Sequence, residues 1–140
     1  MKKVFISCPF GSRTEEAIQE SINKMHEIAE IAFGCELEAV DNYGEHDIPD
    51  GSRSNMYNLG MAIQKMSDCD YFIGIAYPGC FKGCCVENLV ASIYKIPSVH
   101  IDMENYAFLK DAWNIDIKTD YGLRIPEELR KKEEGEIDDL

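Results

Sequence analysis

Positive charge is scarce in this sequence. Its 140 residues include 14 Lys and Arg against 26 Asp and Glu, which gives a formal net charge of −12 at pH 7. Proteins that hold a nucleic-acid polymer need clustered cations to displace counterions from the phosphates. We therefore expect no nucleic-acid polymer as a partner, and small molecules or other proteins instead.

Long hydrophobic runs are also missing. No apolar stretch approaches the ~20 residues that a membrane-spanning helix needs. The first apolar run, at residues 4–7, follows closely on Met1 and is too short for the apolar region of a signal peptide. We expect no membrane association, a cytoplasmic location and reduced thiols.

A metal-binding cysteine pattern is absent as well. Cys80, Cys84 and Cys85 lie close together, but no two cysteines are separated by two residues. Zinc sites usually need two separated ligand pairs. We interpret these three residues as small side chains at a loop and a helix start, and we expect neither a metal nor a cofactor.

The most informative stretch runs from residue 71 to 97. The apolar run 71–76 predicts a strand buried on both faces, a Pro-Gly turn follows at 78–79, and 86–94 has its apolar residues at helical spacing. In an open parallel sheet, ligands bind beside the carboxyl ends of the strands. Glu87 lies in the predicted first turn of this helix, where the helix dipole favours an anionic carboxylate. Glu87 is therefore the first candidate functional residue.

The rest of the chain alternates between strand and helix patterns. A capping box from Ser12 to Glu15 and a stop at Gly34 predict a long first helix. Further strands are predicted at 4–8, 37–40, 98–101 and 115–118, and further helices at 55–67, 106–112 and 125–130. This alternation predicts one α/β domain over residues 1–132, with a mostly parallel sheet of about five strands and helices on both faces. Residues 133–140 are predicted to be an acidic, disordered tail.

Two polar loops follow predicted strands. The first supplies hydroxyls, amides and one cation before a helix, where a phosphate or ribose can rest, although a plain helix cap is equally supported. Its candidate binding residues are Cys8, Pro9, Phe10, Gly11, Ser12 and Arg13. The second loop, 41–52, carries His46 and Asp47, for which a solvated polar loop is the alternative interpretation. Asp68 and Asp70, just before the third strand, are interpreted as turn residues.

Three segments together resemble the nucleoside 2-deoxyribosyltransferase superfamily and its uncharacterised phage and bacterial relatives. They are VFISCPF at 4–10, SDCDYFIGI at 67–75 and YPGCFKGCCVENLVASIYKIPSV at 77–99. The resemblance spans about residues 3–102, and its most specific positions are Gly83, Glu87, Ala91, Lys95, Pro97 and Val99. It implies a flavodoxin-like three-layer sandwich. In that family the glutamate attacks C1′ of the sugar, which makes Glu87 the nucleophile by resemblance.

The resemblance also implies a nucleoside or nucleotide ligand, held by the first loop together with Asn58, Pro78, Gly79 and Gly83. A carboxylate beside the anomeric carbon stabilises an oxocarbenium-like state and can then trap the sugar covalently. The trapped sugar passes to a second base in a transferase and to water in a hydrolase.

The sequence departs from the family pattern at two positions. Relatives commonly carry an aspartate at the place of Ala62, and an aspartate or serine at the place of Phe81. Either another polar residue takes over the work, or the chain is a catalytically silent nucleotide-binding module. The candidates to take over are Asp47, His46, Asn58 and Asp68. In a third interpretation, Glu87 only caps its own helix.

The resemblance implies a homodimer or homotetramer as well. Relatives complete the pocket with a carboxy-terminal segment of a neighbouring subunit. Here the segment 106–114 carries Tyr106, Phe108, Leu109 and Trp113, which predicts an exposed apolar interface.

Overall fold

The fold alternates strictly between strands and helices up to its last strand. The computed structural model describes residues 1–118. The elements are β1 (Lys2–Ile6), α1 (Glu15–Phe33), β2 (Leu37–Val40), α2 (Ser54–Met66), β3 (Tyr71–Ile75), α3 (Lys82–Ile93) and β4 (Ser98–Ile101), followed by two short 3-10 helices (Met103–Asn105 and Ala107–Leu109) and α4 (Lys110–Lys118).

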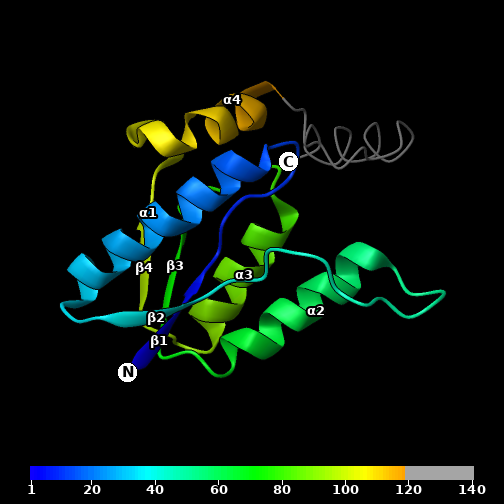
Figure 1. The fold of residues 1–140 in the computed structure, drawn as a ribbon, viewed down its shortest axis with the longest axis horizontal. Coiled ribbons are helices and arrows are strands. Elements are labelled where there is room, and N and C mark those ends of the chain that lie inside the picture. Colours follow the sequence, from blue (N-terminus) through cyan, green and yellow to red (C-terminus); the bar gives the residue numbers. More distant parts are fainter. Residues whose placement is uncertain (119–140) are drawn as a thin grey trace, which may run out of the picture.

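The four strands form one all-parallel sheet in the order β2-β1-β3-β4 (Figure 1). Val4 of β1 lies between Ala39 of β2 and Tyr71 of β3, so β1 is central. The strand order reverses direction between β1 and β3, and such a switch point opens a crevice at the carboxyl ends of the two strands. The predicted flavodoxin-like α/β sandwich is confirmed, with four strands rather than about five.

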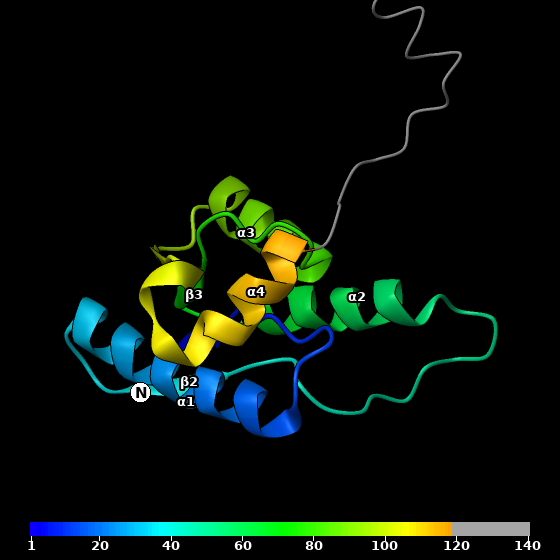
Figure 2. The same cartoon turned by 90° about the horizontal axis from the view of Figure 1, so that it is seen from above.

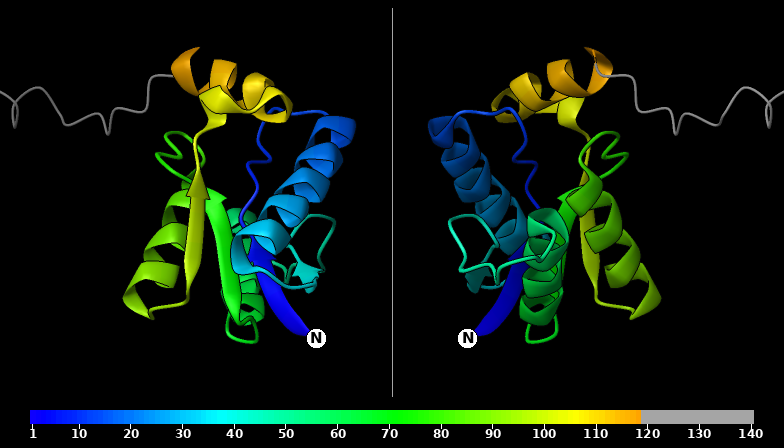
Figure 3. Two further views of the ribbon diagram at one scale, coloured as in Figure 1. Left: turned by 90° about the vertical axis from the view of Figure 1, so that its left-hand side faces the viewer. Right: turned by 90° about the vertical axis from the view of Figure 1, so that its right-hand side faces the viewer.

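Helices cover both faces of the sheet (Figure 3). On one face, Val4, Ile6, Ile73 and Ile75 pack against residues of α1 such as Met25. On the other face, Phe5 and Phe72 pack with Ala62 of α2 and Ala91 of α3. Alternate residues of β1 thus enter opposite cores, which explains why its sequence is a continuous apolar run.

The predicted fifth strand, 115–118, is wrong because these residues continue α4. This helix lies across the carboxyl end of the sheet (Figures 1 and 2). Leu109 and Ala112 are buried at a spacing of one helical turn, which anchors the segment as a helix on the α1-side core. A run of four residues was too short to reveal this period. The helix predicted at 125–130 and the tail predicted at 133–140 lie outside the described residues.

The predicted limits of α1 were right at one end only. Gly34 ends the helix with a left-handed φ of 71°, and its N–H donates to Glu30 O at 2.9 Å. At the other end, the N-cap is Thr14, whose Oγ1 accepts from Ala17 N at 3.1 Å. The capping box predicted at Ser12 is wrong because a turn from Phe10 O to Arg13 N–H delays the helix by two residues.

The segment predicted as an exposed interface packs on its own subunit. Leu109 is fully buried, and the half-buried Tyr106, Phe108 and Trp113 contact the α1-side core. The large apolar side chains that are exposed lie on several other elements, and they include Leu89 and Ile93 of α3 and Tyr94 directly after it. Among residues 1–118, no helix combines the length and the hydropathy that crossing a bilayer requires.

Candidate functional site

A cavity of about 580 Å³ lies at the carboxyl edge of the sheet. Its walls come from the loops after β1 and β3, from the start of the loop after β2, and from the amino-terminal halves of α2 and α3. The lining residues include Cys8, Phe10, Gly11, Asn42, Met56, Asn58, Leu59, Phe81, Lys82, Gly83 and Glu87. This is the place where the switch point between β1 and β3 leads us to expect a ligand.

Glu87 contributes the carboxylate of this cavity, from the second turn of α3. Its side chain is only 8% exposed, and Oε1 accepts a hydrogen bond from Ser7 Oγ at 2.7 Å. The predicted position in the first turn is wrong because α3 begins at Lys82. There a turn from Pro78 O to Phe81 N–H leads the chain directly into the helix.

Burial raises the pKa of Glu87 from its ordinary 4.5 to about 7, although the hydrogen bond from Ser7 acts in the opposite direction. The expectation that the helix dipole keeps this carboxylate anionic is therefore wrong, since desolvation outweighs it. Both protonation states are populated near neutral pH. The group can act as a nucleophile or base when ionised and as a proton donor when protonated.

Two asparagines from different elements line another part of the cavity. Asn42 Nδ2 donates to the backbone oxygen of Asn58 at 2.7 Å, which ties the loop after β2 to α2. The side-chain Oδ1 atoms of Asn42 and Asn58 are buried and accept no hydrogen bond from residues 1–118. A buried acceptor without a partner costs ~1–3 kcal/mol. These two oxygens are occluded, so a ligand could bond to them only after the asparagine side chains turn toward the cavity.

The cavity carries little charge of either sign. Within the described part of the chain, Glu87 is its only lining carboxylate and the exposed Lys82 its only lining cation. Apolar and aromatic side chains such as Phe10, Phe81 and Leu59 make up much of the rest. Flat apolar surfaces beside a few polar groups are typical of sites for small organic molecules.

The structure brings together six of the predicted site residues around this cavity: Cys8, Phe10, Gly11, Asn58, Gly83 and Glu87. Five others, Pro9, Ser12, Arg13, Pro78 and Gly79, lie in the neighbouring loops but do not line it. The guanidinium of Arg13 is turned into the protein, where it pairs with Asp111. Two predicted helpers also lie elsewhere: Asp47 is exposed, and His46 Nε2 lies 3.1 Å from Asn42 O.

Sequence reasoning missed Ser7 and Asn42. Ser7 is the polar residue that ends the buried run of β1, at the carboxyl edge where ligands bind, and this position was its available signal. Asn42 stands at the start of a long polar loop and had no comparable signal.

The two positions that depart from the family pattern differ in their surroundings. Phe81 lines the cavity, whereas Ala62 is fully buried in the core formed by Phe5, Phe72 and Ala91. Asn58, one helical turn before Ala62 on α2, reaches the cavity wall. The polar side chains that α2 presents to the cavity are therefore those of Asn55 and Asn58, and not one at position 62.

Metal ligands do not gather anywhere in residues 1–118, since no three His, Cys, Asp or Glu side chains come together there. All six cysteines are free thiols. Of the group singled out in the sequence, Cys84 is buried, Cys80 is half-buried and Cys85 is exposed.

The fold and the cavity define a flavodoxin-like α/β protein with one buried, elevated-pKa carboxylate beside the switch point of its sheet. No family model, no curated protein and no solved structure matches the chain. Its function is therefore argued from the site, because a common fold hosts many functions.

Replacing Ser7 by alanine should raise the pKa of Glu87 further, since the hydrogen bond from Ser7 favours the ionised form. Loss of a hydrogen bond to a charged group corresponds to ~1 pKa unit or more. We expect the pH titration of Glu87, followed by NMR of the labelled carboxyl carbon, to move to higher pH. An unchanged or lower midpoint would show that Ser7 does not stabilise the carboxylate.

Proposed function

We propose that this protein cleaves the N-glycosidic bond of a nucleoside or nucleotide, with Glu87 as the nucleophile. The observation that carries the proposal is a buried carboxylate, fixed by Ser7 through one oxygen, on the wall of a cavity at the switch point of the sheet. The resemblance in sequence around Gly83 and Glu87 supports the same role.

The chemistry follows from this arrangement. Glu87 Oε2 bonds to C1′ of the sugar as the C1′–N bond breaks, and the electron pair of that bond leaves with the base, which takes up a proton from water. Water or a second base then attacks C1′ as the C1′–Oε2 bond breaks, and the attacking group loses a proton to solvent. Water gives free sugar, a second base gives a new nucleoside, and Glu87 returns to its carboxylate form. The aromatic faces of Phe10 and Phe81 suit the flat base.

The alternative function is a catalytically silent nucleotide-binding module. One specific observation favours it: in residues 1–118, no carboxylate besides Glu87 lines the cavity, so the departing base has no obvious acid beside it. A general acid typically contributes a factor of about 10²–10⁴. A protein without one would bind its ligand and turn it over slowly or not at all.

A panel of nucleosides and nucleotides tests both functions. Base release is followed by chromatography, and binding to the same compounds is measured by calorimetry. Release that depends on Glu87 supports the enzyme, and binding without release supports the silent module. Adding a free second base separates the two reactions, because only a transferase forms the exchanged nucleoside.

We also propose a cytoplasmic location and, as the resemblance implies, a homodimer or homotetramer. The segment 106–114 cannot supply an exposed apolar interface, since its large side chains pack on their own core. Light scattering at micromolar concentration should give the mass of a dimer or tetramer. A monomeric mass would contradict this proposal without affecting the proposed chemistry.

A further inference from the structure

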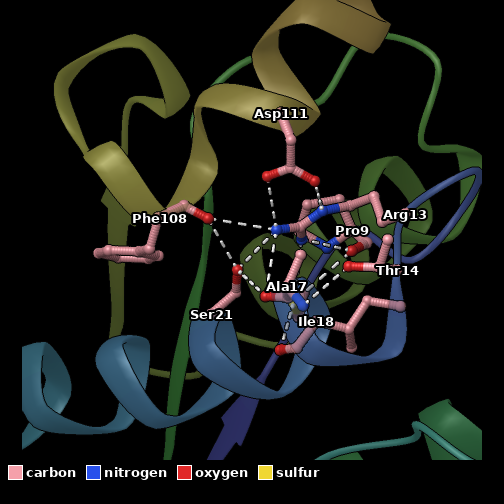
Figure 4. A network of polar contacts seen from close by, with 9 residues as sticks. Pro9, Arg13, Thr14, Ala17, Ile18, Ser21, Phe108 and Asp111 are labelled. Carbon is pink, nitrogen blue, oxygen red and sulfur yellow. Dashed lines mark hydrogen bonds and ion pairs between the residues drawn. The ribbon is translucent and has the colours of Figure 1, made fainter.

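α4 is fastened to the loop after β1 by a buried arginine. Arg13 Nε and one terminal nitrogen donate to the two oxygens of Asp111 on α4, at 2.7 and 3.0 Å (Figure 4). The same guanidinium donates to Pro9 O at 2.8 Å and to Ser21 Oγ of α1 at 2.7 Å. The Arg13 side chain is 0% exposed and that of Asp111 is 43% exposed, so this bidentate ion pair has a buried cation and a carboxylate at the protein surface.

The same helix is fastened to the loop after β3 by a second, independent contact. Asp116 Oδ1 accepts from the backbone N–H of Cys80 at 3.0 Å. Gly79 has a left-handed φ of 51° and passes so close that a Cβ there would overlap the Asp116 carboxylate. Only glycine combines this φ with this approach at low energy.

These two loops form two walls of the cavity that holds Glu87. Cys8, Phe10 and Gly11 line it from the first loop, and Cys80 and Phe81 from the second. Neither Asp111 nor Asp116 lines the cavity. α4 therefore joins both walls from outside, above the carboxyl end of the sheet (Figure 2).

We propose that α4 is a clamp that fixes the two loops beside Glu87, and that Asp111 and Asp116 are positioning residues for this site. Asp111 holds the loop after β1 and Asp116 holds the loop after β3, so each aspartate fixes the position of one cavity wall. The clamp itself rests on the contacts above, and only its effect on turnover rests on the proposed function.

The alkylation rates of two buried thiols measure how readily the two loops open, and this measurement does not depend on catalysis. Cys8 lies in the first loop and is 3% exposed, and Cys84 lies in the first turn of α3, just after the second loop, and is 4% exposed. Both thiols are buried, so their alkylation needs local opening. Cys35 is exposed at the far end of α1 and serves as the internal reference.

The test is alkylation by iodoacetamide at pH 8, resolved by peptide mass spectrometry, in the full chain. Asp111→Ala should speed the labelling of Cys8, and Asp116→Ala that of Cys84, each by about tenfold, the factor that corresponds to ~1.4 kcal/mol of easier opening. Asp116→Asn keeps an acceptor for Cys80 N–H and should restore the wild-type rate. Asp50→Ala, which removes an exposed aspartate in the loop before α2 that does not line the cavity, is the matched control.

Two results would overturn the clamp. One is an unchanged rate at both buried cysteines in folded variants. The other is an equal increase, relative to Cys35, at Cys8, Cys84 and the half-buried Cys69, since α4 would then stabilise the whole fold rather than the loops. Should Asp111→Ala fail to fold with Arg13 left unpaired, Asp116→Ala and Asp116→Asn still decide the question.

If wild type releases base, Asp116→Ala should also lower kcat, and Asp116→Asn should restore it. If wild type releases none, the labelling rates alone decide whether α4 acts as a clamp.

Discussion

Replacing Glu87 by glutamine should abolish base release and, at alkaline pH, make the protein more stable. Glutamine has nearly the same shape and still accepts a hydrogen bond from Ser7, but it cannot form the glycosyl ester. Removal of a nucleophile or its base from well-studied hydrolases lowers kcat by about 10⁴–10⁶. We expect a loss of this order in base release measured by chromatography.

The gain in stability follows from the pKa of Glu87, which rises from 4.5 to about 7 in the folded protein. Between these values the folded state binds more protons than the unfolded state, so the free energy of unfolding of wild type falls as pH rises. The total corresponds to ~3 kcal/mol. Glutamine does not titrate, so the difference in unfolding free energy between Glu87→Gln and wild type should grow by this amount from pH 4 to pH 8.

Denaturant unfolding at the two pH values measures that difference. Glu15→Gln, on an exposed first-turn glutamate of α1, is the matched control and should show little change. A difference at Glu87 that is the same at both pH values would contradict the elevated pKa. Base release at the wild-type rate by a folded Glu87→Gln variant would contradict the proposal that Glu87 is the nucleophile.

The pH dependence of turnover tests the role of the same carboxylate. A nucleophile must be ionised, so kcat/KM should rise with pH through about 7, the pKa of Glu87 in the free protein. A profile that falls through this range would identify a proton donor instead. Ser7→Ala should move the rising limb to higher pH.

The fold was largely predictable because each long element carries its own periodicity. The apolar run 71–76 could only be a strand covered on both faces, and α1 showed a clear helical period and a glycine stop. α4 was misread in part because its anchors, Leu109 and Ala112, lie before the four residues that resemble a strand. Short segments take their structure from what they pack against.

Only the part of the site whose location follows from the sheet topology was predictable. The position of Glu87 after a central strand led to the cavity, because ligands bind at that edge of a parallel sheet. The role of Arg13 was not predictable from the sequence. A cation before a helix suggested a phosphate site, but Arg13 pairs with Asp111, which lies 98 residues further along the chain. A partner at such a distance leaves no local signal.

Introducing an aspartate at Ala62 should destabilise the protein severely and should not create activity. Although relatives carry an aspartate at this place in the sequence, here the side chain is 0% exposed and lies among Phe5, Phe72 and Met66. A carboxyl in such a core has its pKa raised by up to ~3–5 units, so at pH 7 the folded protein must hold it protonated. Because the unfolded carboxyl has a pKa of about 3.9, this costs up to ~4 kcal/mol against folding at pH 7. Whole domains are stable by only ~5–15 kcal/mol.

Asn58→Asp is the matched variant, since it places the same carboxylate one helical turn away, on the cavity wall. We expect it to fold at pH 7, as thermal unfolding will show, with Ala62→Asp unfolded or much less stable. If wild type binds ligand without releasing base, Asn58→Asp is the change expected to bring measurable release, because it adds an acid beside the departing base. Wild-type stability in Ala62→Asp together with a gain of base release would contradict this assignment, because it would place residue 62 at the cavity rather than in the core.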